Sequence, residues 1–181
     1  LQRIEETHFR QWVPTNRLPI GDKTAEPIRL GIDFTHQMHT ERALVAIASY
    51  HNEALANFVP GLWVATAVME GSSLLNRERP FGLPSKLSGT LYISSLVREI
   101  NVFDFIGRKI LKHESRGGLG NAVLGCQSTD RLTSIPSESV DYMFLDPPFG
   151  ANLMYSELNF VWESWLKVLT NNEQEAVVSR A

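Results

Sequence analysis

The chain has 181 residues, of which 43% are hydrophobic and 20% charged, so it is large and apolar enough to bury one core. Its formal net charge of −3 excludes a global basic field that would attract nucleic acid, so a nucleic-acid partner would have to be held locally. The single cysteine, Cys126, excludes an intramolecular disulfide framework, and no apolar run is long enough to span a membrane, so we expect one cytoplasmic domain over residues 1–181 without membrane contact.

The first part of the chain predicts an extended segment followed by two helices. Three prolines and Gly21 fall between positions 11 and 32, so we interpret residues 1–37 as an extended N-terminal segment. Thr40 is expected to cap a helix that ends at about Asn57, because alanine, leucine and isoleucine recur there at helical spacing. Residues 62–75 form an apolar run that is too long for a typical strand, and they predict a buried helix.

The middle of the chain predicts a loop, a short strand and a third helix. Residues 76–89 mix proline and glycine with arginine and lysine, which is typical of a loop, and residues 91–93 predict a strand. Asn101 is expected to cap a helix that ends before the glycine-rich residues 117–120. The side chains expected to face the core from this helix are Val102, Phe103, Phe105, Ile106, Ile110 and Leu111.

The same region is locally basic. Between positions 77 and 116 there are eight basic and four acidic side chains, a local charge of +4 in a chain whose remainder is acidic. We therefore regard it as the best candidate for contacting phosphate, with a solvated loop and helix face as the alternative.

The last third predicts two buried strands and a helix. Residues 122–125 and 140–145 are short apolar runs bounded by turn formers, which indicates strands. Residues 156–169 predict a helix, and its expected apolar face is Leu158, Val161, Trp162, Trp165, Leu166 and Leu169. Helices that alternate with buried strands predict an α/β fold with a mostly parallel sheet flanked by helices.

The sharpest local feature follows the second of these strands. The sequence Asp146-Pro147-Pro148-Phe149 would deliver a carboxylate, two prolines and an aromatic ring to the carboxyl edge of the sheet, where α/β proteins bind ligands. Consecutive prolines fix the backbone and leave carbonyl acceptors without local partners. A planar group with an amine to donate, such as the exocyclic amine of a nucleobase, fits such acceptors beside a stacking ring.

This loop resembles a motif of amino-group DNA methyltransferases, in which Asp, Asn or Ser precedes two prolines and an aromatic residue. The lead-in at residues 135–141 is also similar to theirs, with a proline turn, a serine and then valine-aspartate. The continuation at residues 150–160 and the segment at residues 88–93 resemble a prokaryotic subgroup of large DNA methylases. The resemblance covers most of the chain, most closely residues 121–169.

The resemblance implies a Rossmann-like class I methyltransferase fold and a site-specific DNA methyltransferase, of the kind found in restriction–modification, that acts on adenine N6 or cytosine N4. Asp146 and the carbonyl of Pro147 would accept hydrogen bonds from the amine, Pro148 would stiffen the loop, and Phe149 would stack on a base flipped out of the duplex. Asn152 and Tyr155 would contact the substrate, and Glu157 and Asn159 would line its cleft, although a helix with a solvated face explains these residues about equally well.

The implied cofactor is S-adenosylmethionine. The resemblance suggests that Asp130 and Ser128 lie near its adenine and that Thr40 flanks its methionine end; turn formation and helix capping are the alternative roles. The glycine-rich loop that should follow the first strand is missing, because the glycines at 117–120 precede a strand instead. We therefore expect either a single methyltransferase domain or an incomplete fold that forms the catalytic portion of a longer parent chain.

The remaining candidates give weaker signals. Of five scattered histidines only His36 and His39 are close enough to share a helical face, without a third ligand, so no metal is expected. Cys126 is interpreted as a buried structural thiol. The alternative functions are methylation of RNA, which we expect less than DNA, methylation of a protein glutamine, and a non-catalytic descendant that binds nucleic acid or a partner protein. The sequence leaves the oligomeric state open.

Overall fold

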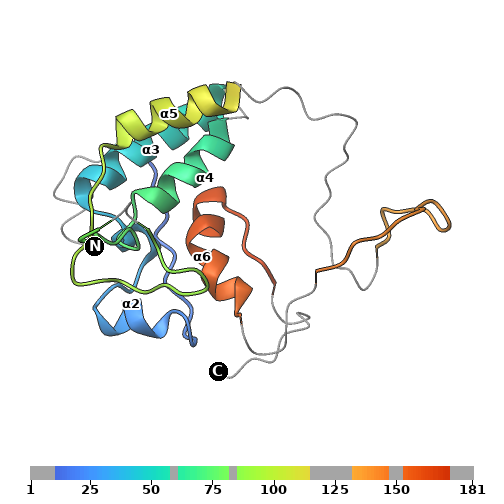
Figure 1. The fold of residues 1–181 in the computed structure, drawn as a ribbon, viewed down its shortest axis with the longest axis horizontal. Coiled ribbons are helices and arrows are strands. Elements are labelled where there is room, and N and C mark those ends of the chain that lie inside the picture. Colours follow the sequence, from blue (N-terminus) through green and yellow to red (C-terminus); the bar gives the residue numbers. More distant parts are fainter. Residues whose placement is uncertain (1–10, 58–60, 82–84, 115–131, 147–152, 172–181) are drawn as a thin grey trace.

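The computed structural model describes residues 11–57, 61–81, 85–114, 132–146 and 153–171. These residues fold into helices joined by irregular segments (Figure 1). The elements are α2 (Ala25–Arg29), the 3-10 helix η1 (Thr35–Met38), α3 (Glu41–Asn57), α4 (Gly61–Gly71), α5 (Val102–Glu114) and α6 (Tyr155–Leu166). Extended pairing in the described ranges is limited to three isolated bridges, which join Arg17 with Phe34 and Arg77 with Ser85 and Val97.

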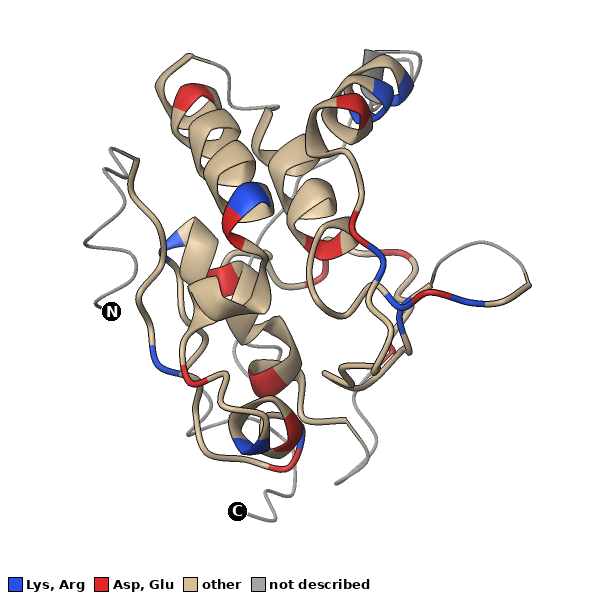
Figure 2. Cartoon of the chain, turned by 90° about the vertical axis from the view of Figure 1, so that its left-hand side faces the viewer, with Lys and Arg blue, Asp and Glu red and all other residues tan. Residues whose placement is uncertain are grey.

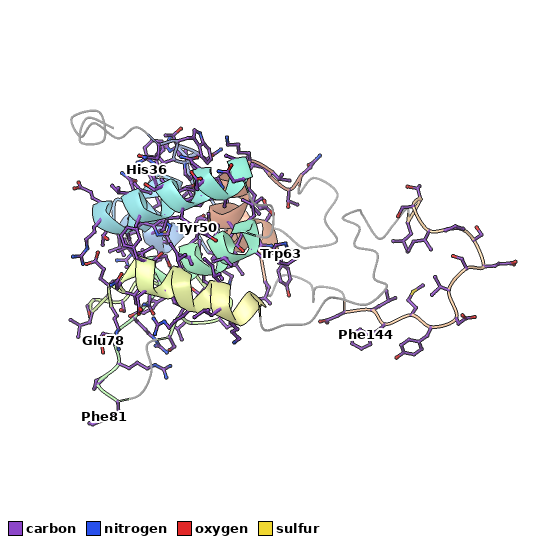
Figure 3. The ribbon with its side chains drawn as sticks, turned by 90° about the horizontal axis from the view of Figure 1, so that it is seen from above. His36, Tyr50, Trp63, Glu78, Phe81 and Phe144 are labelled. Atoms are coloured by element: carbon purple, nitrogen blue, oxygen red, sulfur yellow. The ribbon has the colours of Figure 1, made fainter. Side chains whose placement is uncertain are left out.

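The predicted α/β fold with a mostly parallel sheet is therefore wrong for this part of the chain. Residues 140–145, expected to be a buried strand, have no regular structure and are exposed, with Phe144 80% accessible. The segment that contains them lies apart from the helices, and Phe144 lies far from their side chains (Figures 1 and 3). A strand needs neighbouring strands for its backbone groups, and a short apolar run in the sequence does not reveal whether such neighbours exist.

The other two predicted strands have different outcomes. Residues 91–93 are irregular, so that prediction is also wrong, although Leu91 is buried by packing with Leu18, Met38, Leu75 and Val161. The apolar character of residues 91–93 therefore goes with packing against the core and not with a strand. Residues 122–125 lie outside the described residues.

Helices α3, α4 and α5 pack on one another and form the main core (Figure 1). The two predicted helices at 40–57 and 62–75 are confirmed, although the second ends at Gly71. A Cβ at Gly71 would lie 2.4 Å from the Phe105 ring, so any side chain there would force this ring of α5 to move away from the end of α4. The core residues of this group are Val13, Ala43, Leu44, Ala46, Ile47, Ala48, Val64, Ala65, Val68, Met69, Val102, Ile106 and Trp165.

Helix α5 is confirmed, but the face it turns to the core is narrower than predicted. Val102 and Ile106 are buried, and Phe105 and Ile110 pack partly against the core. Phe103 and Leu111 are 72% and 67% exposed, so their predicted core role is wrong. Leu111 lies on the side of the helix away from Val102 and Ile106, whereas Phe103 lies at the edge of their face, and only one side of α5 has a neighbouring helix in the described structure.

The N-terminal residues pack against α6 instead of only extending across the surface. Residues 25–29 and 35–38 are helical, two short elements that the prediction of an extended segment over 1–37 missed. The amide of Lys23 donates to Glu157 of α6 at 2.7 Å, and the Thr35 hydroxyl bonds to Ser164 at 3.2 Å. Helix α6 ends at Leu166, earlier than predicted, because Lys167 adopts a left-handed conformation with φ of 59°.

Trp165 of α6 lies in the middle of a cluster of rings, in which His39 and His51 are also buried and Trp12 is partly exposed. Its ring centroid is 5.4 Å from that of His51, 6.1 Å from that of His39 and 6.1 Å from that of Trp12. Among the described residues, neither ring nitrogen of His51 has a hydrogen-bond partner within bonding geometry, and the same is true of Nε2 of His39 and Nε1 of Trp165. The cluster joins α6, α3 and the N-terminal segment through packing more than through hydrogen bonds.

Within the described ranges, no helix combines the length and the apolar character needed to cross a membrane.

Candidate functional site

The residues of the proline motif are only partly described. Asp146 is the last described residue of the exposed segment, and its side chain is exposed. Pro147, Pro148, Phe149 and Asn152 lie outside the described residues. The predicted cofactor residues Ser128 and Asp130, and also Cys126, lie outside them as well. Their predicted roles therefore stay predictions.

Tyr155, the other predicted substrate residue, lines a cavity of about 520 Å³ between α6 and residues 86–91. This cavity, which we call the α6 cavity, is bounded by Leu153 and one face of α6, by residues 86–91, and by Glu70 and Leu75 from the end of α4 and the loop after it. Tyr155, Asn159 and Trp162 follow one another at i, i+4 and i+7, so they share a face of the helix. The two segments that suggested the methylase subgroup, 88–93 and 150–160, each contribute residues to this cavity.

A glycine holds the loop of the α6 cavity against the start of α6. Gly89 has φ of +70°, in the left-handed region that favours glycine, and a Cβ there would lie 2.9 Å from Cδ2 of Leu153. The backbone conformation therefore favours glycine, and a Cβ there would also force the end of the Leu153 side chain to move. Gly89 thereby places Ser88 and Thr90 opposite α6 in the wall of the α6 cavity.

The charged groups of the α6 cavity compensate each other. Lys86 Nζ forms an ion pair with Glu70 and lies 5.6 Å from the centroid of the Trp162 ring. Partial burial lowers the pKa of Lys86, and no other charged residue lines the cavity. The cavity therefore has no net formal charge. No sequence pattern indicates the pairing of Lys86 with Glu70, which lie 16 positions apart on different elements, and Trp162 was expected only in the core.

Thr40, predicted to flank the cofactor, makes the contacts of a helix cap. Its hydroxyl donates to Oε1 of Glu99 at 2.7 Å and accepts a 3.3 Å bond from the amide of Ala43. Arg42 also bonds to Glu99 through both of its carboxylate oxygens, and these bonds from Thr40 and then Arg42 lower the pKa of Glu99. Any cofactor contact of Thr40 would have to replace these partners.

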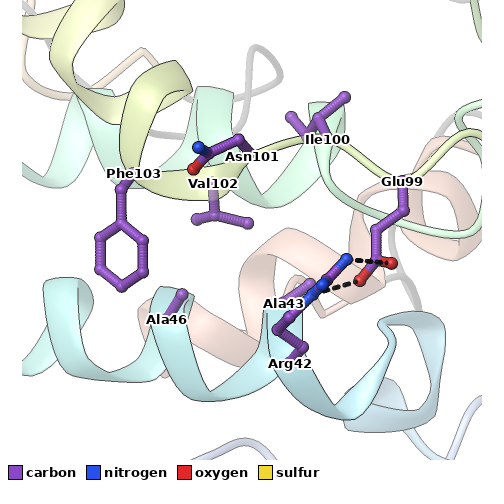
Figure 4. Close-up of a pocket in the computed structure, with 8 residues that line it drawn as sticks. All are labelled: Arg42, Ala43, Ala46, Glu99, Ile100, Asn101, Val102 and Phe103. Carbon is purple, nitrogen blue, oxygen red and sulfur yellow. Dashed lines mark hydrogen bonds and ion pairs between the residues drawn. The ribbon is translucent and has the colours of Figure 1, made fainter.

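The Arg42–Glu99 pair also borders a second cavity of about 320 Å³ between α3 and the start of α5 (Figure 4). The rest of its wall is mostly apolar and includes Ala43, Ala46, Val102 and Phe103. Since its one cation and one anion are bonded to each other, this cavity offers no free charge to a ligand.

Three of the eight basic side chains at positions 77–116 lie beside acidic groups in the described structure. Lys86 pairs with Glu70, Arg98 Nε lies 3.6 Å from Glu78, and an Arg108 nitrogen lies 3.4 Å from Asp104. Glu78 and Asp104 are already counted in the local charge of +4, so of these three partners only Glu70 adds neutralising charge. Acidic and basic residues are interspersed over the described helices and loops (Figure 2). The predicted phosphate contact therefore stays a prediction.

Three of the histidines, His36, His39 and His51, are buried. His36 Nδ1 lies 3.2 Å from the Pro14 carbonyl, and His39 Nδ1 lies 3.5 Å from the Ser72 carbonyl. Burial lowers the pKa of His36 and His51, and it lowers that of His39 to about 4. Among the described residues, no three histidine, cysteine or acidic side chains are grouped closely enough to hold a metal ion.

No family model, curated protein or solved structure matches the chain. The site must therefore be argued from its own residues.

Proposed function

We propose that this chain forms part of an S-adenosylmethionine-dependent DNA methyltransferase that acts on the exocyclic amine of adenine or cytosine. The observation that carries the proposal is that the two segments that resemble the methylase subgroup, far apart in the sequence, border the same cavity. The Asp146-Pro147-Pro148-Phe149 sequence supplies the chemistry that suits an amine. A cytoplasmic location agrees with the single cysteine and belongs to the same proposal.

The residues of the chain would act by holding the amine. The carboxylate of Asp146 and the Pro147 carbonyl each accept a hydrogen bond from one N–H group of the amine. These two bonds turn the nitrogen lone pair out of the ring plane. Phe149 stacks on the flipped base and repays part of the flipping cost, which is on the order of a few kcal/mol. These roles are positional and need no covalent intermediate with the protein.

S-adenosylmethionine would supply the methyl group. Of the residues predicted to contact it, the structure describes only Thr40, whose hydroxyl is bonded to Glu99 and Ala43. The described residues thus do not form a fitted site for the cofactor. Its binding groups would have to come from Ser128, Asp130 or other residues beyond the described ranges, including those of a longer parent chain.

The proposal is tested by methyl transfer from labelled S-adenosylmethionine to duplex DNA, to RNA and to a glutamine peptide. We expect transfer to DNA, and we expect Asp146→Ala to reduce its rate by about 10² or more, the usual cost of losing one preorganised polar contact in a transition state. Asp141→Ala, which removes a neighbouring exposed carboxylate, is the matched control and should leave the rate unchanged.

Transfer only to RNA or only to the peptide would replace DNA as the substrate. Asp146→Ala with unchanged turnover would remove the amine-holding role. No transfer to any substrate, together with DNA binding that weakens as salt rises, would favour the non-catalytic alternative.

A further inference from the structure

We propose that an exposed stripe of α5 is a docking surface for α5 of a second copy of this chain, with the two helices antiparallel. The stripe consists of Phe103, Gly107 and Leu111, and we call it the α5 stripe. The inference does not depend on the proposed function, because none of these residues belongs to the α6 cavity or to the proline motif.

The residues of the α5 stripe lie in line along the helix. They are four positions apart, and at 3.6 residues per turn four positions return to within about 40° of the same side. Phe103 and Leu111 are 72% and 67% exposed. Helices α3 and α4 pack on the side of α5 that carries Val102 and Ile106, and α5 lies at the outer edge of this group (Figure 1). A second helix can therefore reach the stripe from outside.

The packing of a single copy does not explain Gly107. A glycine inside a helix destabilises it relative to alanine, because glycine loses more backbone freedom when it becomes ordered. At Gly71 a Cβ would meet the Phe105 ring, whereas at Gly107 no atom of another described element lies within 4 Å of the Cβ position. The result is a notch between two large apolar side chains, and such a notch lets the backbone of another helix approach closely.

The spacing of the α5 stripe matches that of an antiparallel copy. Phe103 and Leu111 each lie four residues from Gly107, about 6 Å along the helix axis. A two-fold axis between the two Gly107 positions therefore puts Phe103 of one copy opposite Leu111 of the other at both ends of the stripe. Four large apolar side chains then leave water around one close approach of the two backbones.

The charges beside the α5 stripe favour the antiparallel arrangement. Asp104 and Arg108 are exposed on one flank of the stripe and lie 3.4 Å apart within one copy. In the antiparallel pair this flank carries Asp104, then Arg108 of the second copy, then Arg108, then Asp104 of the second copy, at steps of about 3 Å along the axis. Two attractive neighbours then outnumber one repulsive neighbour, whereas a parallel pair in register would place each charge beside its own kind. This complementarity points to a second copy as the occupant.

Sedimentation equilibrium of the 181-residue chain at about 5–500 µM tests the proposal. We expect a monomer–dimer equilibrium with Kd on the order of 10–100 µM, since one pair of helices makes a small interface. Gly107→Gln should weaken the association about tenfold or more, because the new side chain holds the two backbones apart, and it should leave the monomer folded, because the Cβ position is open. Ala56→Gln, at an exposed position of α3, is the matched control and should leave Kd unchanged.

Two charge variants test the pairing across the interface. Asp104→Arg makes all four charges of the flank positive, and Arg108→Asp makes all four negative, so each variant alone should be mostly monomeric at about 100 µM. An equimolar mixture of the two should associate at least as tightly as the unchanged chain, because the charges on the flank then alternate in sign. Far-UV circular dichroism should be the same for every variant.

A chain that stays monomeric at about 500 µM would overturn the inference and leave the α5 stripe to a different partner. Association that persists in Gly107→Gln would also overturn it, because the interface would then lie elsewhere, for example on the exposed apolar side chains of residues 140–145. Charge variants that fail to associate when mixed would contradict the second copy as the occupant.

Discussion

At the scale of single residues, buried histidines make the stability of the fold depend on pH. His39 and His51 lie in the core against Trp165, and burial lowers the pKa of both, that of His39 to about 4. Lys167, which lies over Trp12, and His36 add small repulsions that act in the same direction. Burial therefore stabilises the neutral form of both imidazoles relative to the charged form.

The sign of the pH effect follows from proton binding. Between about pH 6.5 and 4 the unfolded chain binds a proton that folded His39 does not, so protonation favours unfolding, and the lowered pKa of His51 acts in the same direction. The stability that neutral His39 contributes is complete above about pH 6.5, falls as pH drops toward 4, and changes little below that. For His39 the loss is on the order of 3 kcal/mol, a large part of the stability of a typical domain.

Urea unfolding at pH 7.5, 6 and 5 measures this loss, with the double variant His39→Leu/His51→Leu as the comparison. Leucine takes up no proton, so the variant should lose less stability over the same range. His36, the third histidine with a lowered pKa, leaves a small residual dependence. An equal pH dependence in the two proteins would show that the loss comes from other groups.

At the scale of elements, Trp165 is the residue that fixes α6 to the rest of the core. It is fully buried and contacts rings from the N-terminal segment and from α3. Trp165→Ala should therefore lower the free energy of unfolding by about 3–5 kcal/mol, the usual cost of removing a large buried ring. Trp63→Ala, which removes a tryptophan that is 65% exposed, should change it by less than about 0.5 kcal/mol. Similar losses in both variants, measured by denaturant unfolding, would contradict the structural role of Trp165.

The helices also show which sequence patterns were sufficient to predict secondary structure. Helices α3, α5 and α6 were predictable because each repeats apolar residues at helical spacing over several turns, and α4 because its apolar run is too long for a typical strand. The short elements α2 and η1 lack such a repeat; α2 is only five residues long, and η1 is held by contacts such as the amide of Thr35 with the carbonyl of Asn16. The candidate cavity was predictable only on the α6 side, since Lys86 and Glu70 meet through the packing of different elements.

At the scale of the whole molecule, the fold class failed because it depended on strands whose partners the sequence does not show. Residues 140–145 have the apolar character of a buried strand, yet they are exposed, and their backbone makes no hydrogen bond to other residues that the structure describes. The Asp146-Pro147-Pro148-Phe149 motif that follows them can be recognised from the sequence without any sheet. The fold around the motif could not be predicted in the same way, because strand pairing is a long-range property.

This arrangement predicts a sharp contrast in amide hydrogen exchange. The amides of residues 141–146 should exchange near the rate of an unfolded chain, whereas those of residues 65–69 in α4 should be among the slowest, because they are hydrogen-bonded within a buried helix. Mass spectrometry of the exchanged chain resolves the two segments directly. Strong protection of residues 141–146 would mean that their backbone is paired in solution and that the exposed form is not the dominant one. Adding DNA and S-adenosylmethionine provides the functional comparison, since the proposed amine-holding role of Asp146 requires this segment to become ordered around its substrate.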